Sequence, residues 1–176
     1  MNAEELRALQ APLKARYRDD PATARVAATA VGRLEADGVT CRIETGKAPV
    51  LAGLHRATGG TGEEACSGDM LLEALVACAG VTLKAVATAM SVPLRGGTVR
   101  ADGVFDARGT LGVAKDAPVG LQDVRLHFDL ETDAPPEKIA KLIELTERYC
   151  VIYQTLRHPP EIAMSFKAHG AGGVAD

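Results

Sequence analysis

Residues 70–90 read MLLEALVACAGVTLKAVATAM and carry only two charged side chains, Glu73 and Lys84. Most of the apolar side chains fall on one wide stripe at 100° per residue, while Glu73, Gly80 and Lys84 fall opposite it. The stripe contains Leu71, Ala74, Leu75, Cys78, Val81, Thr82, Ala85 and Val86. A charge in each half of the segment is costly in hydrocarbon, which argues against a transmembrane span. We therefore expect a long central core helix with Cys78 on its buried side.

The composition bounds the class of protein. A chain of 176 residues suits one domain with an appendage, and its 47% apolar content is ordinary for a globular protein. Aromatic residues are only 3%, so dimerisation is an attractive way to bury more surface. The net charge of −3 and the absence of a long basic block argue against nucleic acid binding. The first residues lack a signal-peptide core, so we expect a cytoplasmic protein without membrane attachment, whose four cysteines are thiols.

The chain divides into three parts by pattern. For residues 1–21 we predict an amphipathic helical appendage that is kinked or broken at Pro12. Residues 22–168 should form the main domain, and residues 169–176 a flexible tail. The glycine-rich segment 57–69 has no phosphate-binding motif, and Ser67 or Asp69 is the expected N-cap of the central helix.

Alternating and helical periodicities give the order of elements. We predict strands at 25–34, 39–45, 50–56, 99–108, 124–131 and 162–166, and a second helix that begins after Asp133 and carries Cys150 and Tyr153 on its buried stripe. Strand 50–56 ends with Arg56 on its apolar row. The order β-β-β-α-β-β-α-β lacks regular βαβ alternation. It favours an α+β domain with one antiparallel sheet covered on one face by helices.

Cys78 and Cys150 are the residues most suggestive of chemistry. Each lies on the buried stripe of its own helix, and both helices should cover the same sheet, so the thiols could approach each other. Buried cysteine also behaves as a small hydrophobe, which leaves a purely structural role open. A reactive thiol must be a thiolate, and the mid-helix position of Cys78 removes its own helix N-terminus as a stabilising source. Arg56 is the best candidate cation.

Two blocks resemble the OsmC/Ohr superfamily of osmotically inducible and organic hydroperoxide resistance proteins. SGDMLLEALVACAGVTLKAVA, at 67–87, is similar to its first-cysteine helix, and ELTERYCVIYQTLRHPPEI, at 144–162, to its second-cysteine segment. The resemblance covers roughly residues 23 to 167. It implies a two-layer α+β fold with a long central helix, an intertwined homodimer and active sites near the interface.

The resemblance also implies roles for individual residues. Cys78 would be the peroxidatic thiol, Cys150 the resolving thiol and Arg56 the family arginine, which lies 22 residues before Cys78. Asp69 would replace the glutamate that orients this arginine. In a regular helix Asp69 would face away from Cys78, so it would act from the cap or through Arg56. Some relatives have proline after the second cysteine, where this chain has Val151.

The implied activity is reduction of organic hydroperoxides and hydrogen peroxide. Thiolate attack gives a Cys78 sulfenic acid, Cys150 closes a disulfide, and a cellular dithiol, with lipoyl groups as one donor in the family, restores both thiols. No bound cofactor or metal is required. The alternative is a non-catalytic protein that binds a small molecule or acyl group in the interface cavity, with Cys78 in its lining.

The remaining cysteines and histidines receive less specific predictions. Cys66 precedes a helix N-terminus, which lowers a thiol pKa, so an accessory thiol or a substitute resolving thiol stays open beside an incidental loop cysteine. We expect Cys41 in the core, His55 at the surface or an interface, and His127 on the charged face of a strand. No grouping has zinc spacing.

Overall fold

The computed structural model describes residues 2–27, 30–34, 40–44 and 48–167. Their main helices and strands are α1 (Ala3–Asp19), β1 (Val31–Leu34), β2 (Thr40–Glu44), β3 (Val50–Gly53), β4 (Ala65–Cys66), α2 (Ser67–Ala89), β5 (Gly96–Val104), α3 (Ala107–Thr110), β6 (Gln122–Glu131), α4 (Pro136–Tyr149) and α5 (Val151–Arg157). Two short 3₁₀ turns lie at η1 (Pro21–Ala24) and η2 (Arg56–Thr58). The mixed α+β class is confirmed.

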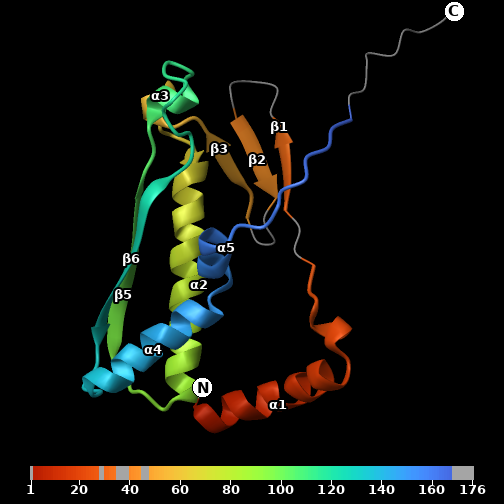
Figure 1. Ribbon diagram of the computed structural model, residues 1–176, viewed down its shortest axis with the longest axis vertical. Helices are drawn as coiled ribbons and strands as arrows, with labels where there is room; N and C mark the ends of the chain where they lie inside the picture. Colours follow the sequence, from red (N-terminus) through yellow and green to blue (C-terminus); the bar gives the residue numbers. More distant parts are fainter. Residues whose placement is uncertain (1, 28–29, 35–39, 45–47, 168–176) are drawn as a thin grey trace, which may run out of the picture.

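The strands form two sheets among the described residues, so the single antiparallel sheet expected from the sequence is wrong. β1, β2 and β3 form the expected antiparallel meander, and the two-residue strand β4 adds to β3 in parallel. β5 and β6 form a separate long antiparallel pair. Figure 1 shows this pair along one side of α2 and the meander near the other. β4 was missed because two residues are too few for a periodicity.

The core lies where α2 meets α4 and the β5–β6 pair. Leu83 and Ala87 of α2 are buried together with Val92 and Leu142, and Phe128 and Leu130 of β6 pack against them. Along β5 and β6 the charged side chains are exposed and Val99, Ala101, Leu126, Phe128 and Leu130 are partly buried, as the alternation predicted. Val124, from the same predicted row, is 42% exposed. This core holds α2 and α4 in a fixed relation.

The central helix is present but is turned relative to the expected stripe. Its buried side chains are Leu75, Ala79, Leu83 and Ala87. Val81, from the predicted stripe, is 73% exposed, whereas Gly80, predicted to be wet, faces Val99 of β5. The cause is that this helix is apolar on almost every side, so periodicity alone does not select the packed face. Its length and composition also suit a membrane span, yet β5, α4 and α5 pack on it.

Several boundaries differ from the expectations. Residues 25–27 and 30 are not part of a strand, and the rest of the predicted stretch before β1 lies outside the described residues. The C-terminal segment 162–166 is not a strand, and Phe105 lies beyond the end of β5. The N-cap of α2 is Cys66, which makes no side-chain capping bond, so the assignment to Ser67 or Asp69 is wrong. α1 contains Pro12, has no buried residue and lies beside the C-terminal end of α2 (Figure 1). The division into appendage, domain and tail stays a prediction.

Candidate active site

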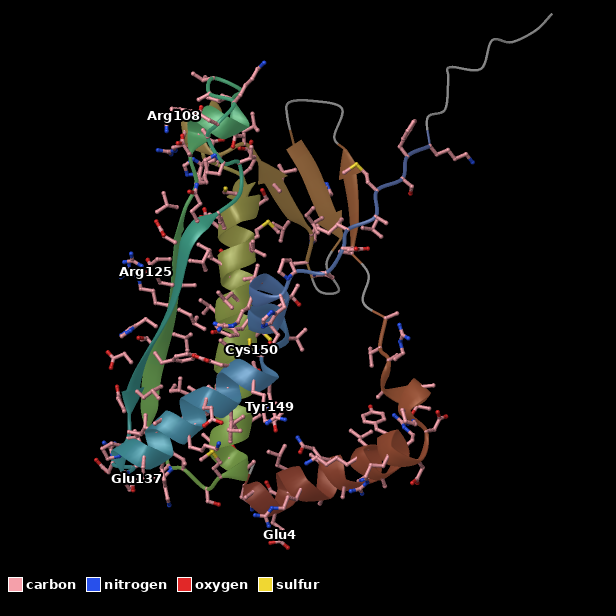
Figure 2. The ribbon with its side chains drawn as sticks, in the orientation of Figure 1. Glu4, Arg108, Arg125, Glu137, Tyr149 and Cys150 are labelled. Carbon is pink, nitrogen blue, oxygen red and sulfur yellow. The ribbon has the colours of Figure 1, made fainter. Side chains whose placement is uncertain are left out.

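The thiols of Cys78 and Cys150 meet between α2 and the junction of α4 with α5. Cys78 lies midway along α2, and Cys150 is the single residue between the other two helices. Both are free thiols that interact through a side-chain hydrogen bond. Cys150 has no exposed surface, and Figure 2 shows it at the junction beside α2. The structure therefore brings together the two cysteines that the sequence singled out.

The sequence predicted one helix through this segment, but a break separates α4 from α5. Cys150 has φ −74° and ψ 109°, an extended conformation that ends α4 at Tyr149. Its N–H still donates to Thr146 O over 2.9 Å, and its own carbonyl accepts from Gln154 N over 3.0 Å. The change of direction at Cys150 turns the first N–H groups of α5 toward the sulfur of Cys78.

Opposing influences act on Cys78. Burial is the largest and by itself raises the pKa of the thiol, because desolvation disfavours the thiolate. The backbone N–H of Ile152, the thiol of Cys150, the N–H of Val151 and the hydroxyl of Thr82 donate to the sulfur and lower its pKa. Together these donors outweigh burial, so the pKa of Cys78 lies below its ordinary value. The arrangement favours a thiolate at this position.

Cys150 is shifted in the opposite direction. Burial raises its pKa, and the hydrogen bond to Cys78 and the charge of the Cys78 thiolate raise it further. The N–H groups of Tyr153 and Ile152 oppose this shift without cancelling it. The two pKa values thus shift in opposite directions, so the pair is polarised, with the thiolate favoured at Cys78 and the protonated thiol favoured at Cys150.

The source of thiolate stabilisation was missed from the sequence. The helix that carries Cys78 cannot offer its own N-terminus to a mid-helix residue, as expected. However, the first N–H groups of a different helix reach the sulfur. The segment Cys-Val-Ile contains no glycine or proline to signal a break, so the pattern continued through Cys150.

Arg56 does not lie beside Cys78 of its own chain. It belongs to the η2 turn after β3, not to the strand expected from the alternation, and is exposed. Its side chain lies over Gly62, where an added Cβ would collide with the guanidinium. Gly62 has φ 77°, a left-handed conformation that glycine adopts readily. Arg56 is therefore held against the loop that precedes α2.

Asp69 also lies away from Cys78. It is in the first turn of α2, nine residues before Cys78, which corresponds to about 13 Å along the axis and half a turn of rotation. It borders a surface hollow with Leu72, Glu73 and Ala101 on the β5 side of the helix. Within one chain, Arg56 and Asp69 do not join the cysteine pair.

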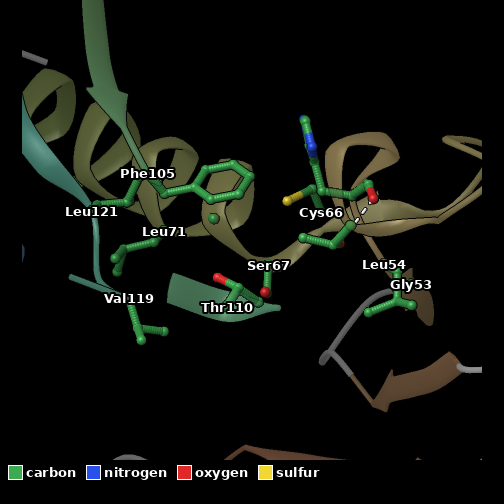
Figure 3. Close-up of a pocket in the computed structure, with 12 residues that line it drawn as sticks. Gly53, Leu54, Cys66, Ser67, Leu71, Phe105, Thr110, Val119 and Leu121 are labelled. Carbon is green, nitrogen blue, oxygen red and sulfur yellow. Dashed lines mark hydrogen bonds between the residues drawn. The ribbon is translucent and has the colours of Figure 1, made fainter. Parts of the chain in front are cut away.

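A separate cavity of about 350 Å³ lies at the N-terminal end of α2, where Cys66 is located. Leu54, Leu71 and Phe105 contribute apolar walls, and Figure 3 shows them with Cys66 among the residues that line the cavity. Cys66 is twelve residues before Cys78, about 18 Å along α2, so it cannot reach that sulfur within one chain. This cavity is lined by Cys66 and not by Cys78.

The structure places the remaining candidate residues, His55, His127 and Cys41, away from the cysteine pair. His55 lines the cavity, meets Phe105 edge to face at 5.1 Å, and its Nδ1 accepts from Ala57 N. His127 is exposed on β6, as expected. Cys41 belongs to β2, and its side chain lies outside the described part of the chain. Within the described ranges no three His, Cys, Asp or Glu side chains are grouped to hold a metal ion.

Sequence comparison supplies the family. The family model described as OsmC-like protein matches residues 60–165, which include both cysteines of the pair. The chain belongs to the OsmC-like family. No curated protein matches this OsmC-like chain in sequence.

Solved structures support the same assignment at the level of the fold. An OsmC-like protein from Mycoplasma pneumoniae has a TM-score of 0.64 and 16% identity, covering 76% of this chain and 89% of its own. The organic hydroperoxide resistance protein OsmC from Legionella pneumophila has a TM-score of 0.61 and 16% identity, covering 76% of this chain and 93% of its own. The organic hydroperoxide resistance protein OhrB of Bacillus subtilis has a TM-score of 0.53 and 17% identity, covering 76% of this chain and 93% of its own. At these identities the likeness establishes the OsmC-like fold.

Proposed function

We propose that this OsmC-like protein is a cytoplasmic thiol-dependent peroxidase that protects against organic hydroperoxides and hydrogen peroxide. The observation that carries the proposal is the polarised pair, in which the pKa of Cys78 is lowered and that of Cys150 is raised. A purely structural pair of buried cysteines does not need N–H donors directed at one sulfur. Fold relatives titled organic hydroperoxide resistance proteins support the same role.

The proposed reaction has three balanced steps. The Cys78 thiolate attacks one oxygen of ROOH, the O–O bond breaks, and ROH leaves after taking a proton, which gives Cys78–SOH. The Cys150 thiol attacks the sulfenic sulfur and releases water as the disulfide forms. An external dithiol then reduces the disulfide and becomes a disulfide itself. A lipoylated protein is the proposed donor, and no bound cofactor takes part.

A homodimer is the proposed assembly. Large apolar side chains near the cysteine pair are exposed, including Val81 at 73% and Val151 at 68%. The C-terminal residues Ile162 and Phe166 are 88% and 95% exposed. A second copy would cover this surface, and light scattering over a range of protein concentrations measures the mass.

Within such a dimer, we propose that Arg56 and Asp69 act on Cys78 of the other chain. Mixing inactive Arg56→Ala and Cys78→Ser proteins tests this arrangement, because a mixed dimer then contains one intact site. Recovery of up to half of the activity per mixed dimer is expected. Failure to recover activity in verified mixed dimers would exclude the contribution of Arg56 from the second chain.

The central experiment is titration of thiols before and after one equivalent of cumene hydroperoxide. The proposal expects loss of two thiols per chain and no loss in the Cys78→Ser variant, with Cys66→Ser as the matched control that behaves like the unchanged protein. A reaction no faster than that of free cysteine would refute the peroxidase.

The cavity at the start of α2 favours a second candidate function, a non-catalytic protein that binds a small molecule or acyl group. Its volume of about 350 Å³ and its apolar lining suit a compact ligand. Leu71→Trp should fill this cavity and abolish such binding while leaving peroxide-dependent thiol loss unchanged. Retention of ligand by that variant would contradict binding in this cavity.

A further inference from the structure

The break at Cys150 redistributes backbone hydrogen bonds. In an uninterrupted helix, the N–H of Val151 would donate to Glu147 O and that of Ile152 to Arg148 O. Neither bond occurs between α4 and α5 in the described structure, because both N–H groups act on the Cys78 sulfur. The break therefore leaves carbonyl groups at the end of α4 without their helical donors.

The side chain of Gln154 donates a hydrogen bond to one of these carbonyl groups. Its Nε2 donates to Glu147 O over 2.8 Å and spans the break from the α5 side. The other side-chain hydrogen bonds given for α5 stay within that helix, namely Thr155 Oγ1 to Val151 O and Arg157 to the Tyr153 hydroxyl. In the described chain, Gln154 is thus the α5 side chain that ties this helix to α4 by a hydrogen bond.

We propose that Gln154 is a positioning residue that keeps the helix broken and thereby holds the Val151 and Ile152 amides against the Cys78 sulfur. Glu147 O accepts the Gln154 side chain in the broken form and would accept the Val151 N–H after closure of the helix. By donating to this carbonyl, Gln154 weakens its attraction for the Val151 amide. α5 packs on α2 but has no fully buried side chain of its own, so we expect its direction relative to α4 to depend on the hydrogen bonds at the break.

The inference deepens the proposed peroxidase because the held amides favour the reactive thiolate. It nevertheless rests on a thiol property that can be measured without any peroxide. A failure of peroxide turnover would leave the inference intact, and a failure of the inference would leave the disulfide chemistry intact.

The test is Gln154→Met, which keeps the length of the side chain and removes the donor. The readout is the pH dependence of Cys78 alkylation by iodoacetamide in the reduced full-length protein, followed by peptide mass spectrometry. We expect the midpoint to move to higher pH and the rate at neutral pH to fall about three- to tenfold, the effect of one lost hydrogen bond. Thr155→Val, whose lost bond lies within α5, is the matched control and should be unchanged.

A double variant separates positioning from general damage. Val151→Pro removes the competing N–H and disfavours a helical conformation at Cys150, so the helix cannot close onto Glu147 O. Adding Gln154→Met to Val151→Pro should therefore change Cys78 alkylation by less than twofold. The full Gln154 effect in that background, or unchanged alkylation in the single variant, would overturn the proposal. Gln154→Asn, whose amide is one methylene too short, serves as a second variant if Gln154→Met does not fold.

Discussion

The two helical segments that carry the cysteines differ in continuity. α2 runs unbroken through Cys78, so its backbone donors around that residue are used within the helix. The α4–α5 segment is interrupted at Cys150 and directs two backbone N–H groups at the sulfur on the other helix. The continuous helix thus carries the proposed nucleophile Cys78, whereas the interrupted segment supplies the N–H groups that lower the pKa of that thiol. Buried side chains anchor α2 and α4, but none anchors α5.

The largest effect is expected from substitutions of the residue at the break. Cys150→Ser keeps a hydroxyl donor to Cys78 but cannot form a disulfide, so peroxide consumption should stop at one equivalent per chain with a trappable sulfenic acid at Cys78. Cys150→Ala should also stop turnover and, because the donor is lost, should raise the pKa of Cys78. Dimedone labelling and pH-dependent alkylation measure both outcomes. Sustained turnover in Cys150→Ser would assign resolution to another thiol.

Because α4 has buried side chains and α5 has none, substitutions in the two helices should differ in their effect on the free energy of unfolding. Leu142 of α4 has no exposed surface, and Leu142→Ala should lower the free energy of unfolding by about 2–5 kcal/mol, because it leaves a cavity in the core. Val151→Ala in α5 removes a side chain that is 68% exposed and should change it by less than about 0.5 kcal/mol. Urea unfolding measures both. Equal losses would show that α5 is anchored as firmly as α4.

A smaller effect is expected when the break is made permanent. Proline is tolerated at the first position of a helix, and Cys150 already has the extended conformation that a following proline requires. Val151→Pro should therefore keep the fold but remove one donor, slowing Cys78 alkylation at neutral pH about two- to tenfold. Val151→Ala is the control. A faster reaction would mean that the Val151 N–H does not stabilise the thiolate.

The pH profile gives the finest test of the contrast. Because the pKa of Cys78 is lowered and that of Cys150 is raised, alkylation of Cys78 should begin at lower pH than that of Cys150. In guanidinium chloride the two profiles should merge near the value of free cysteine, about 8.5. Coincident profiles in the folded protein would contradict the polarised pair.

Much of this architecture could be predicted because it depends on strong periodicities. The long apolar segment predicted α2, and alternation predicted the strands β5 and β6. The two cysteine blocks predicted that Cys78 and Cys150 approach each other, as the structure shows. The rotation of α2 could not be predicted, since Leu83 and Val81 are both apolar in the sequence and only the packing of the neighbouring elements buries Leu83 and leaves Val81 exposed.

The details of the site depend on backbone geometry that residue types do not specify. Nothing in Cys-Val-Ile marks the extended conformation of Cys150, so the donors to Cys78 were missed. The alternation of residues 50–56 predicted that Arg56 ends a strand, but β3 ends at Gly53 and Arg56 lies in the turn that follows it. Its proposed action on a second chain involves an interface that periodicity within one chain cannot describe.

The direct passage of β4 into α2 has a mechanical consequence. β4 ends at Cys66 and α2 begins at Ser67, so no linker residue separates the strand from the helix. β4 also pairs with β3, which joins it to the meander of β1 and β2. The start of α2 is thus fastened to the meander by both the chain itself and the β3–β4 hydrogen bonds, with no flexible segment between the sheet and the helix that carries Cys78.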